Sequence, residues 1–146
     1  MSTIKNIVFD LGGVVIDLDI TCSMQRFEKL GIKNIGEILD AYEQRGIFLA
    51  LERGEVDLPG FCDALSQYAG KTLSIEEVTY AWLGFIVDVP QYKLDYILEL
   101  RKRYRVFLLS NTNPAIFEWA QTAGFSPACR PIGDYFDKIY VSYKLG

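Results

Sequence analysis

Two short, continuously apolar runs constrain the fold of this chain more than any other feature, because each ends abruptly in a polar residue. The first predicted strand covers residues 4–9 and ends at Asp10. The second covers residues 106–109 and ends at Ser110, and a third strand is predicted over residues 138–142. Apolar runs without polar alternation are typical of strands that are buried on both faces of a parallel sheet.

Helical patterns separate these strands. The predicted helices cover residues 21–30 and 34–45, a segment capped by Asp57, a segment capped by Ser74, and shorter segments that begin at Pro90 and Pro114. Residues 20–87 therefore form one helical block in which no strand is predicted. Strands separated by helices indicate an α/β fold with a parallel sheet and right-handed crossover connections.

Composition excludes several classes of function. The 146 residues include no histidine, which excludes histidine-dependent catalytic triads and the usual histidine metal sites. The formal net charge of −4 argues against nucleic acid as the main partner, because phosphate backbones require clustered lysine and arginine. The three cysteines, Cys22, Cys62 and Cys129, form no CxxC pair, so we expect reduced and mostly buried thiols.

No apolar run in the sequence approaches the length of a membrane span, and the first residues lack the apolar core of a signal peptide. We therefore expect a cytoplasmic protein without a membrane partner.

The ends of the first two strands carry the residues with the clearest chemistry. Ligands of parallel sheets bind at the carboxyl ends of the strands, so Asp10 and Ser110 are expected to share a site. Gly12 and Gly13 allow the backbone to approach a ligand and to present N–H groups to an anion. A carboxylate is favourable beside such an anion site if Mg²⁺ lies between them, or if the carboxylate attacks phosphorus. Together with Ser110 and Asn111, these residues predict Mg²⁺-assisted phosphoryl transfer through an aspartyl-phosphate.

Three segments resemble a known family. The sequences FDLGGVVID at residues 9–17 and LLSNTN at residues 108–113 resemble the first two motifs of the haloacid dehalogenase-like hydrolases. YFDKIYVSYKLG at residues 135–146 resembles the segment that leads into the third motif of that family. The helical block, with ERGEV at residues 52–56, is similar to the small helical cap of the subfamily that contains sugar-phosphate phosphatases, especially the branch that acts on hexose 1-phosphates.

The resemblance implies a Rossmann-like core of residues 1–19 and 88–146, with an inserted all-helical cap of residues 20–87. It implies that Asp10 is the nucleophile and a ligand of Mg²⁺, and that the backbone carbonyl of Gly12 is a second ligand. Ser110 and the amide of Asn111 would hold the transferring phosphoryl group. The implied substrate is a small phosphorylated metabolite such as a sugar phosphate.

Gly12 departs from the pattern of most phosphatases of the family, which carry a second aspartate at this position as general acid and base. Members that act by dehalogenation or phosphonate cleavage lack that aspartate, and so does the DLGxV branch, which includes phosphatases. A dehalogenase-type activity on another substrate therefore remains an alternative. Asp17 and Asp19 are expected to lie in the hinge into the cap.

The sequence contains neither the lysine of the third family motif nor the acidic pair of the fourth, and it supplies three of the five family strands. We therefore expect a C-terminally truncated hydrolase that is inactive alone. The first strand would form an exposed apolar edge through which two copies could associate. The alternatives are a non-catalytic regulatory or binding remnant of the fold and a receiver-type signalling domain, which the long helical insertion disfavours.

Overall fold

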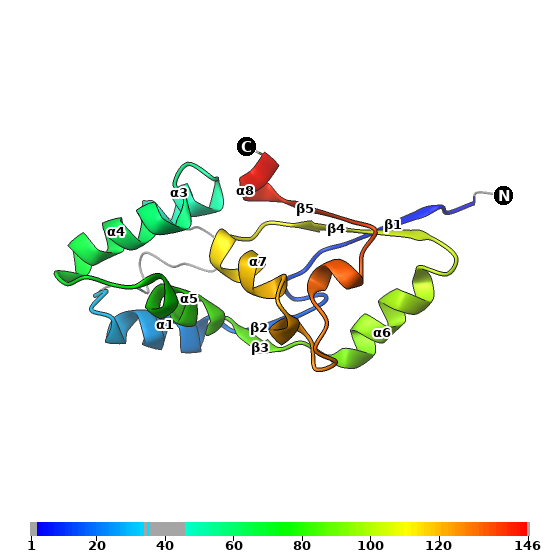
Figure 1. Cartoon of the computed structure of the whole chain (residues 1–146), viewed down its shortest axis with the longest axis horizontal. Coiled ribbons are helices and arrows are strands. Elements are labelled where there is room, and N and C mark those ends of the chain that lie inside the picture. The colour runs from blue at the N-terminus through cyan, green and yellow to red at the C-terminus, as the bar shows by residue number, and fades with distance from the viewer. Residues whose placement is uncertain (1–2, 34, 36–45, 146) are drawn as a thin grey trace.

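A computed structural model describes residues 3–33, 35 and 46–145 of the chain (Figure 1). Its sheet has three parallel strands in the order β1-β4-β5, formed by Asn6–Phe9, Arg105–Ser110 and Lys138–Val141. All three predicted strands and the α/β class are confirmed, with strand boundaries that differ by one or two residues.

Strand β1 lies at an edge of the sheet, because among the described residues it pairs with β4 alone. Val8 of β1 is 61% exposed and Leu109 of the central strand β4 is 52% exposed, so the prediction that these apolar runs are buried on both faces is wrong for both strands. The expectation of an exposed apolar edge is confirmed for the part of the chain that the structure describes. An apolar run indicates that a strand is suited to burial, but it does not show whether neighbouring helices or strands are present to bury it.

Helices α6 (Gln91–Leu100) and α7 (Pro114–Ala120) pack against the sheet (Figure 1). Leu94 of α6, Leu108 of β4 and Phe117 of α7 belong to one buried cluster that forms the core around the sheet. The predicted starts at Pro90 and Pro114 agree with the structure, where Pro90 is the N-cap of α6 and Pro114 is the first residue of α7. Shorter helices are the 3₁₀ turns Ala123–Phe125 and Ile132–Asp134 and the terminal α8 (Ser142–Leu145).

The helical region contains α1 (Ile20–Lys29), α3 (Ile47–Glu52), α4 (Leu58–Ala69) and α5 (Ile75–Leu83). Asp57 caps α4 by accepting a 2.8 Å hydrogen bond from the amide of Gly60. Ser74 and Glu77 exchange the two hydrogen bonds of a capping box at the start of α5. Both predicted caps are confirmed. Helix α3 was not predicted, and the predicted helix over residues 34–45 falls almost wholly outside the described residues.

A two-stranded antiparallel sheet joins the helical region to the core, and the sequence did not predict it. It consists of β2 (Asp17–Leu18) and β3 (Ile86–Asp88), which are adjacent in Figure 1. The expectation that residues 20–87 contain no strand is therefore wrong at its C-terminal end. Strands of two and three residues are too short to show alternation, so pairing between distant segments defines them.

The helical region has its own buried cluster, in which Trp82 packs with Phe27, Phe48 and Phe61. Ile116 of α7 belongs to the same cluster, so the helical region packs against the core at the start of α7. Within the described residues, no helix has both the length and the apolar character needed to cross a bilayer.

The three cysteines are free thiols, as predicted, but the expectation that most are buried is wrong. Cys22 and Cys129 are exposed, and Cys62 alone is buried. Burial, together with the nearby charges of Asp63 and Glu76, raises the pKa of the Cys62 thiol to about 11.

At about pH 8, iodoacetamide is expected to alkylate Cys22 and Cys129 and to leave Cys62 unmodified, because the thiolate is the reactive form. Peptide mass spectrometry of the folded protein would measure the three rates. Labelling of Cys62 should increase as the pH rises toward its pKa of about 11. Equal rates at all three positions under native conditions would contradict the prediction.

Candidate active site at the strand ends

The parallel register brings the ends of β1 and β4 together. Phe9 pairs with Leu108, so Asp10 leaves β1 beside the last residues of β4, where Ser110 ends the strand. The expectation that Asp10 and Ser110 lie at the same edge of the sheet is confirmed. Asp10 is exposed, and its carboxylate accepts a 2.8 Å hydrogen bond from the amide of Leu11.

The loop after Asp10 is a compact turn. The carbonyl of Leu11 accepts hydrogen bonds from the amides of Val15 at 2.9 Å and Ile16 at 3.0 Å. Gly13 adopts a φ of 77°, which favours glycine, and donates its own N–H to the carbonyl of Ile16 at 2.8 Å. This N–H is therefore engaged within the turn, which differs from the predicted role of Gly13 in phosphate binding.

Gly12 has a packing role that the sequence did not predict. A Cβ placed on Gly12 would lie 2.6 Å from Cδ1 of Leu18, so the Leu18 side chain occupies the space beside this backbone. An aspartate at position 12, as most phosphatases of the resembled family carry, would have to displace that leucine. In this chain the apolar side chain of Leu18 therefore lies in the space beside Gly12 where the usual acid would begin.

The last residue of β4 and the three residues after it, residues 110–113, present four polar side chains to the same edge. Ser110 is buried, and Asn113 caps α7 by accepting a 3.1 Å hydrogen bond from the amide of Ile116. Asn111 is held at both ends of its side-chain amide. Its Oδ1 accepts a 2.6 Å hydrogen bond from Oγ of Ser142, and its Nδ2 donates to Oε1 of Glu52.

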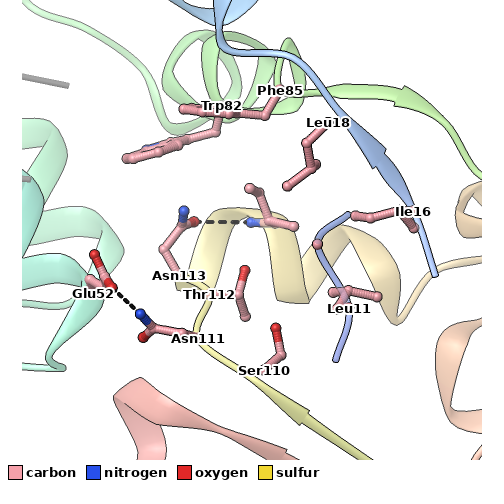
Figure 2. Close-up of a pocket in the computed structure, with 12 residues that line it drawn as sticks. Leu11, Ile16, Leu18, Glu52, Trp82, Phe85, Ser110, Asn111, Thr112 and Asn113 are labelled. Atoms are coloured by element: carbon pink, nitrogen blue, oxygen red, sulfur yellow. Dashed lines mark hydrogen bonds between the residues drawn. The ribbon is translucent and has the colours of Figure 1, made fainter. Parts of the chain in front are cut away.

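Glu52 lines the pocket, although the sequence favoured an ordinary surface turn over contact with the substrate at this position. It lies at the end of α3, in the ERGEV turn, and it reaches the loop after β4 from the helical region (Figure 2). That turn was noted in the sequence as a similarity to family caps, but nothing in its spacing indicated a contact with Asn111. A second contact lies close by, because a Cβ at Gly54 would overlap the carbonyl oxygen of Tyr143 in α8.

These elements enclose a pocket of about 290 Å³. Figure 2 shows Trp82, Phe85 and Leu18 along one side of it and the segment after β4 along the other. The lining residues are Leu11, Gly12, Ile16, Leu18, Glu52, Trp82, Phe85, Ser110, Asn111, Thr112, Asn113 and Ile116. Of the predicted site residues, Gly12, Ser110 and Asn111 line the pocket, whereas Asp10 and Gly13 do not.

Asp17 and Asp19 lie in the connection between the two parts of the chain and do not line the pocket. Asp17 belongs to β2 and forms a 3.5 Å ion pair with Lys93. Asp19 caps α1, and its hydrogen bond from the backbone amide of Thr21 holds the pKa of its carboxyl below the usual value. A carboxylate engaged in this way remains ionised at neutral pH, which makes Asp19 a poor proton donor.

The residues present fit a magnesium ion in part. Magnesium is commonly bound by one or two carboxylates together with water and substrate phosphate. Asp10 supplies one carboxylate, and the backbone carbonyl of Gly12 lies two residues further along the same loop. Within residues 3–33, 35 and 46–145, no group of three or more acidic, cysteine or histidine side chains could enclose a metal. The described residues thus provide two possible magnesium ligands at the end of β1.

Comparison with known proteins identifies the class of enzyme that this chain resembles. The chain is 50% identical over 143 residues to a D-ribitol-5-phosphate phosphatase of Bacteroides thetaiotaomicron, a match that covers 98% of this chain and 69% of that protein. No protein-family model matches the chain.

Two solved structures are similar over nearly the whole chain. A predicted haloacid dehalogenase-like family hydrolase from Porphyromonas gingivalis is 44% identical, with a TM-score of 0.91 over 99% of this chain and 69% of that one. A haloacid dehalogenase family enzyme from Bacteroides thetaiotaomicron, solved with magnesium and inorganic phosphate, is 39% identical with a TM-score of 0.86. The second match covers 98% of this chain and 71% of that one.

Proposed function

The chain belongs to the haloacid dehalogenase-like hydrolase family. We propose that it carries two parts of a magnesium-dependent phosphatase for small sugar or polyol phosphates: the nucleophile, and the phosphate loop formed by Ser110 and Asn111 at the end of β4. The observation that carries this proposal is the arrangement of Asp10 and Ser110 at the ends of neighbouring parallel strands, where Ser110 and the two residues after Asp10 line a pocket. The identity of 50% to a D-ribitol-5-phosphate phosphatase supports the substrate class.

In the proposed reaction, a carboxylate oxygen of Asp10 attacks phosphorus while the bond from phosphorus to the ester oxygen breaks, and the leaving oxygen takes a proton from water and departs as the alcohol. Water then attacks the aspartyl-phosphate, which releases inorganic phosphate and restores the carboxylate of Asp10. Ser110 and the backbone amide of Asn111 would hold the phosphoryl oxygens throughout. Residues 20–87 would act as a cap over a core of residues 1–19 and 88–146, and would exclude water from the pocket.

Magnesium would be held by the carboxylate of Asp10 and the backbone carbonyl of Gly12, and when bound it would neutralise charge on the phosphoryl oxygens. Its presence with phosphate in a 39% identical relative supports this assignment. Each of the two protein ligands comes from the loop that follows β1.

The family's remaining motifs bear on whether residues 1–146 suffice for activity. The described residues that line the pocket include no cationic side chain. Lys144, the last lysine of the chain, lies with Nζ 5.2 Å from the centroid of the Phe117 ring and is not part of the pocket wall. We therefore propose that a third-motif lysine and a fourth-motif acidic pair, which longer members of the family supply, are needed to complete the site.

Turnover of p-nitrophenyl phosphate with magnesium tests the proposed function. We expect residues 1–146 to be at least about a hundred-fold less active than a chain extended with the part of the Bacteroides phosphatase outside the match, since single electrostatic groups typically contribute that much. Full activity of residues 1–146 would contradict the requirement for further motifs. An inactive extended chain that still binds phosphate would favour the non-catalytic binding protein instead.

We further propose that residues 1–146 associate through the exposed edge of β1, where Val8 and Ile4 are 61% and 64% exposed. Analytical ultracentrifugation is expected to detect dimers or larger species that a Val8→Lys change reduces, because a charge at an edge strand opposes pairing. A control change of Val87→Lys alters a similarly exposed valine away from this edge. A chain that is monomeric at all concentrations would contradict the proposal.

A further inference from the structure

We propose that Glu52 selects the leaving group of the substrate by accepting hydrogen bonds from its hydroxyl groups, an inference that rests on the phosphatase function proposed above. Among the described residues that line the pocket, Glu52 alone carries an ionisable side chain. It comes from α3, in the helical region, whereas the phosphate loop comes from the end of β4. The two parts of the chain therefore contribute different chemistry to one pocket.

Charge determines which part of a phosphate ester can lie beside Glu52. A phosphoryl group carries negative charge and is repelled by a carboxylate, whereas a hydroxyl group can donate a hydrogen bond to it. The phosphoryl group is therefore directed toward Ser110 and Gly12, and the uncharged leaving group lies toward Glu52. A hydroxylated leaving group is favoured there over one without hydroxyl groups.

The structure holds the Glu52 carboxylate in a defined position. Its Oε1 accepts a hydrogen bond from Nδ2 of Asn111, whose Oδ1 accepts in turn from Oγ of Ser142 at 2.6 Å. The amide of Asn111 is thus fixed from both sides and presents its N–H to the carboxylate. The second oxygen of Glu52 has no donor among the described residues, which leaves acceptor capacity for a ligand.

The wall formed by the helical region suits the carbon skeleton of such a leaving group. The rings of Trp82 and Phe85 are stacked, with centroids 5.6 Å apart and an interplanar angle of 21°, and both residues line the pocket. The cavity of about 290 Å³ lies at the small end of the range for ligand sites. Because Trp82 is only 1% exposed, a short polyol or a single sugar ring would place its carbon–hydrogen groups against Phe85 and its hydroxyl groups toward Glu52.

The test compares two substrates in the extended chain and its Glu52→Gln variant. Glutamine retains the shape and an oxygen that can accept from Asn111, but it removes the charge. We expect kcat/KM for D-ribitol 5-phosphate to fall about 10- to 100-fold, mainly through KM, because a hydrogen bond to a charged group is lost. The leaving group of p-nitrophenyl phosphate has no hydroxyl group besides the one formed when the ester bond breaks. For this substrate we expect kcat/KM to change by less than about three-fold. Inhibition by inorganic phosphate should not weaken in this variant, because the change removes a negative charge near the phosphate site.

Glu55→Gln is the matched control, because Glu55 is an exposed carboxylate of the same turn that does not line the pocket. It should leave both substrates unaffected. Equal losses for the two substrates in Glu52→Gln, or no loss for either, would overturn the selection role while leaving the phosphatase function in place. A wild-type extended chain that hydrolyses neither ester in a manner that depends on Asp10 would overturn the proposed function and this inference together.

Discussion

Replacing Asp10 with asparagine in the extended chain is expected to reduce turnover of phosphate esters by at least about a thousand-fold. The amide cannot attack phosphorus as a carboxylate does, and the one carboxylate among the described residues that line the pocket, Glu52, comes from α3 and not from the end of β1. Initial rates with p-nitrophenyl phosphate would measure the loss. Mass spectrometry after rapid quenching should detect a phosphorylated wild-type enzyme and no phosphorylated Asp10→Asn variant.

Asp17→Asn provides the control for this change. Asp17 is a carboxylate of the same segment, but it belongs to β2 and pairs with Lys93, whereas Asp10 follows β1 directly. Because a partly exposed ion pair contributes little, we expect a rate within about three-fold of wild type. Substantial turnover by the Asp10→Asn enzyme would show that another group attacks phosphorus, and the assignment of the nucleophile would then be wrong.

The position of Asp10 beside Ser110 could be predicted because it follows from local patterns and one rule of topology. Each apolar run identified a strand, and the polar residue after each run identified the strand's end. Parallel pairing then required the two ends to meet at the same edge. Helix caps were equally readable, since Asp57 and Ser74 act on amides only three residues away.

The contact between Glu52 and Asn111 could not be predicted in the same way. The two residues are 59 positions apart, and their contact depends on how the helical region packs against α7 and α8. No local pattern encodes that packing. The pairing of β2 with β3 was missed for the same reason, since strands of two or three residues have no periodicity of their own.

For Gly12, the sequence showed which residue is present but did not show all of the reasons why a glycine is accommodated there. The sequence indicated a close approach of backbone to ligand and the loss of a proton-transferring group. The structure adds Leu18, whose side chain fills the space that a larger residue at position 12 would use. A Gly12→Asp change would therefore require the Leu18 side chain, which is 45% exposed, to move aside.

Replacing Trp82 with alanine is expected to destabilise the helical region by about 3–5 kcal/mol, since this is the usual cost of truncating a large buried aromatic residue. Trp82 is 1% exposed and has four phenylalanine rings within 6 Å. A loss of that size is a large part of the stability of an ordinary domain, which is about 5–15 kcal/mol. Urea unfolding followed by circular dichroism would measure the change. Trp119, the second tryptophan of the chain, is only partly buried, so Trp119→Ala should cost less.

Trp82→Phe separates the ring from its N–H group. The indole Nε1 is buried without a hydrogen-bond partner among the described residues, so part of the stabilisation from burying this side chain is offset by the cost of desolvating a donor. Phenylalanine keeps most of the aromatic contact and removes that donor, and we expect a loss of only about 1–2 kcal/mol. A loss equal to that of Trp82→Ala would mean that the N–H group itself stabilises the fold, and that it has a partner in the folded protein. The two substitutions together therefore test whether Trp82 acts mainly through apolar packing, which is the property that its place among four phenylalanines predicts.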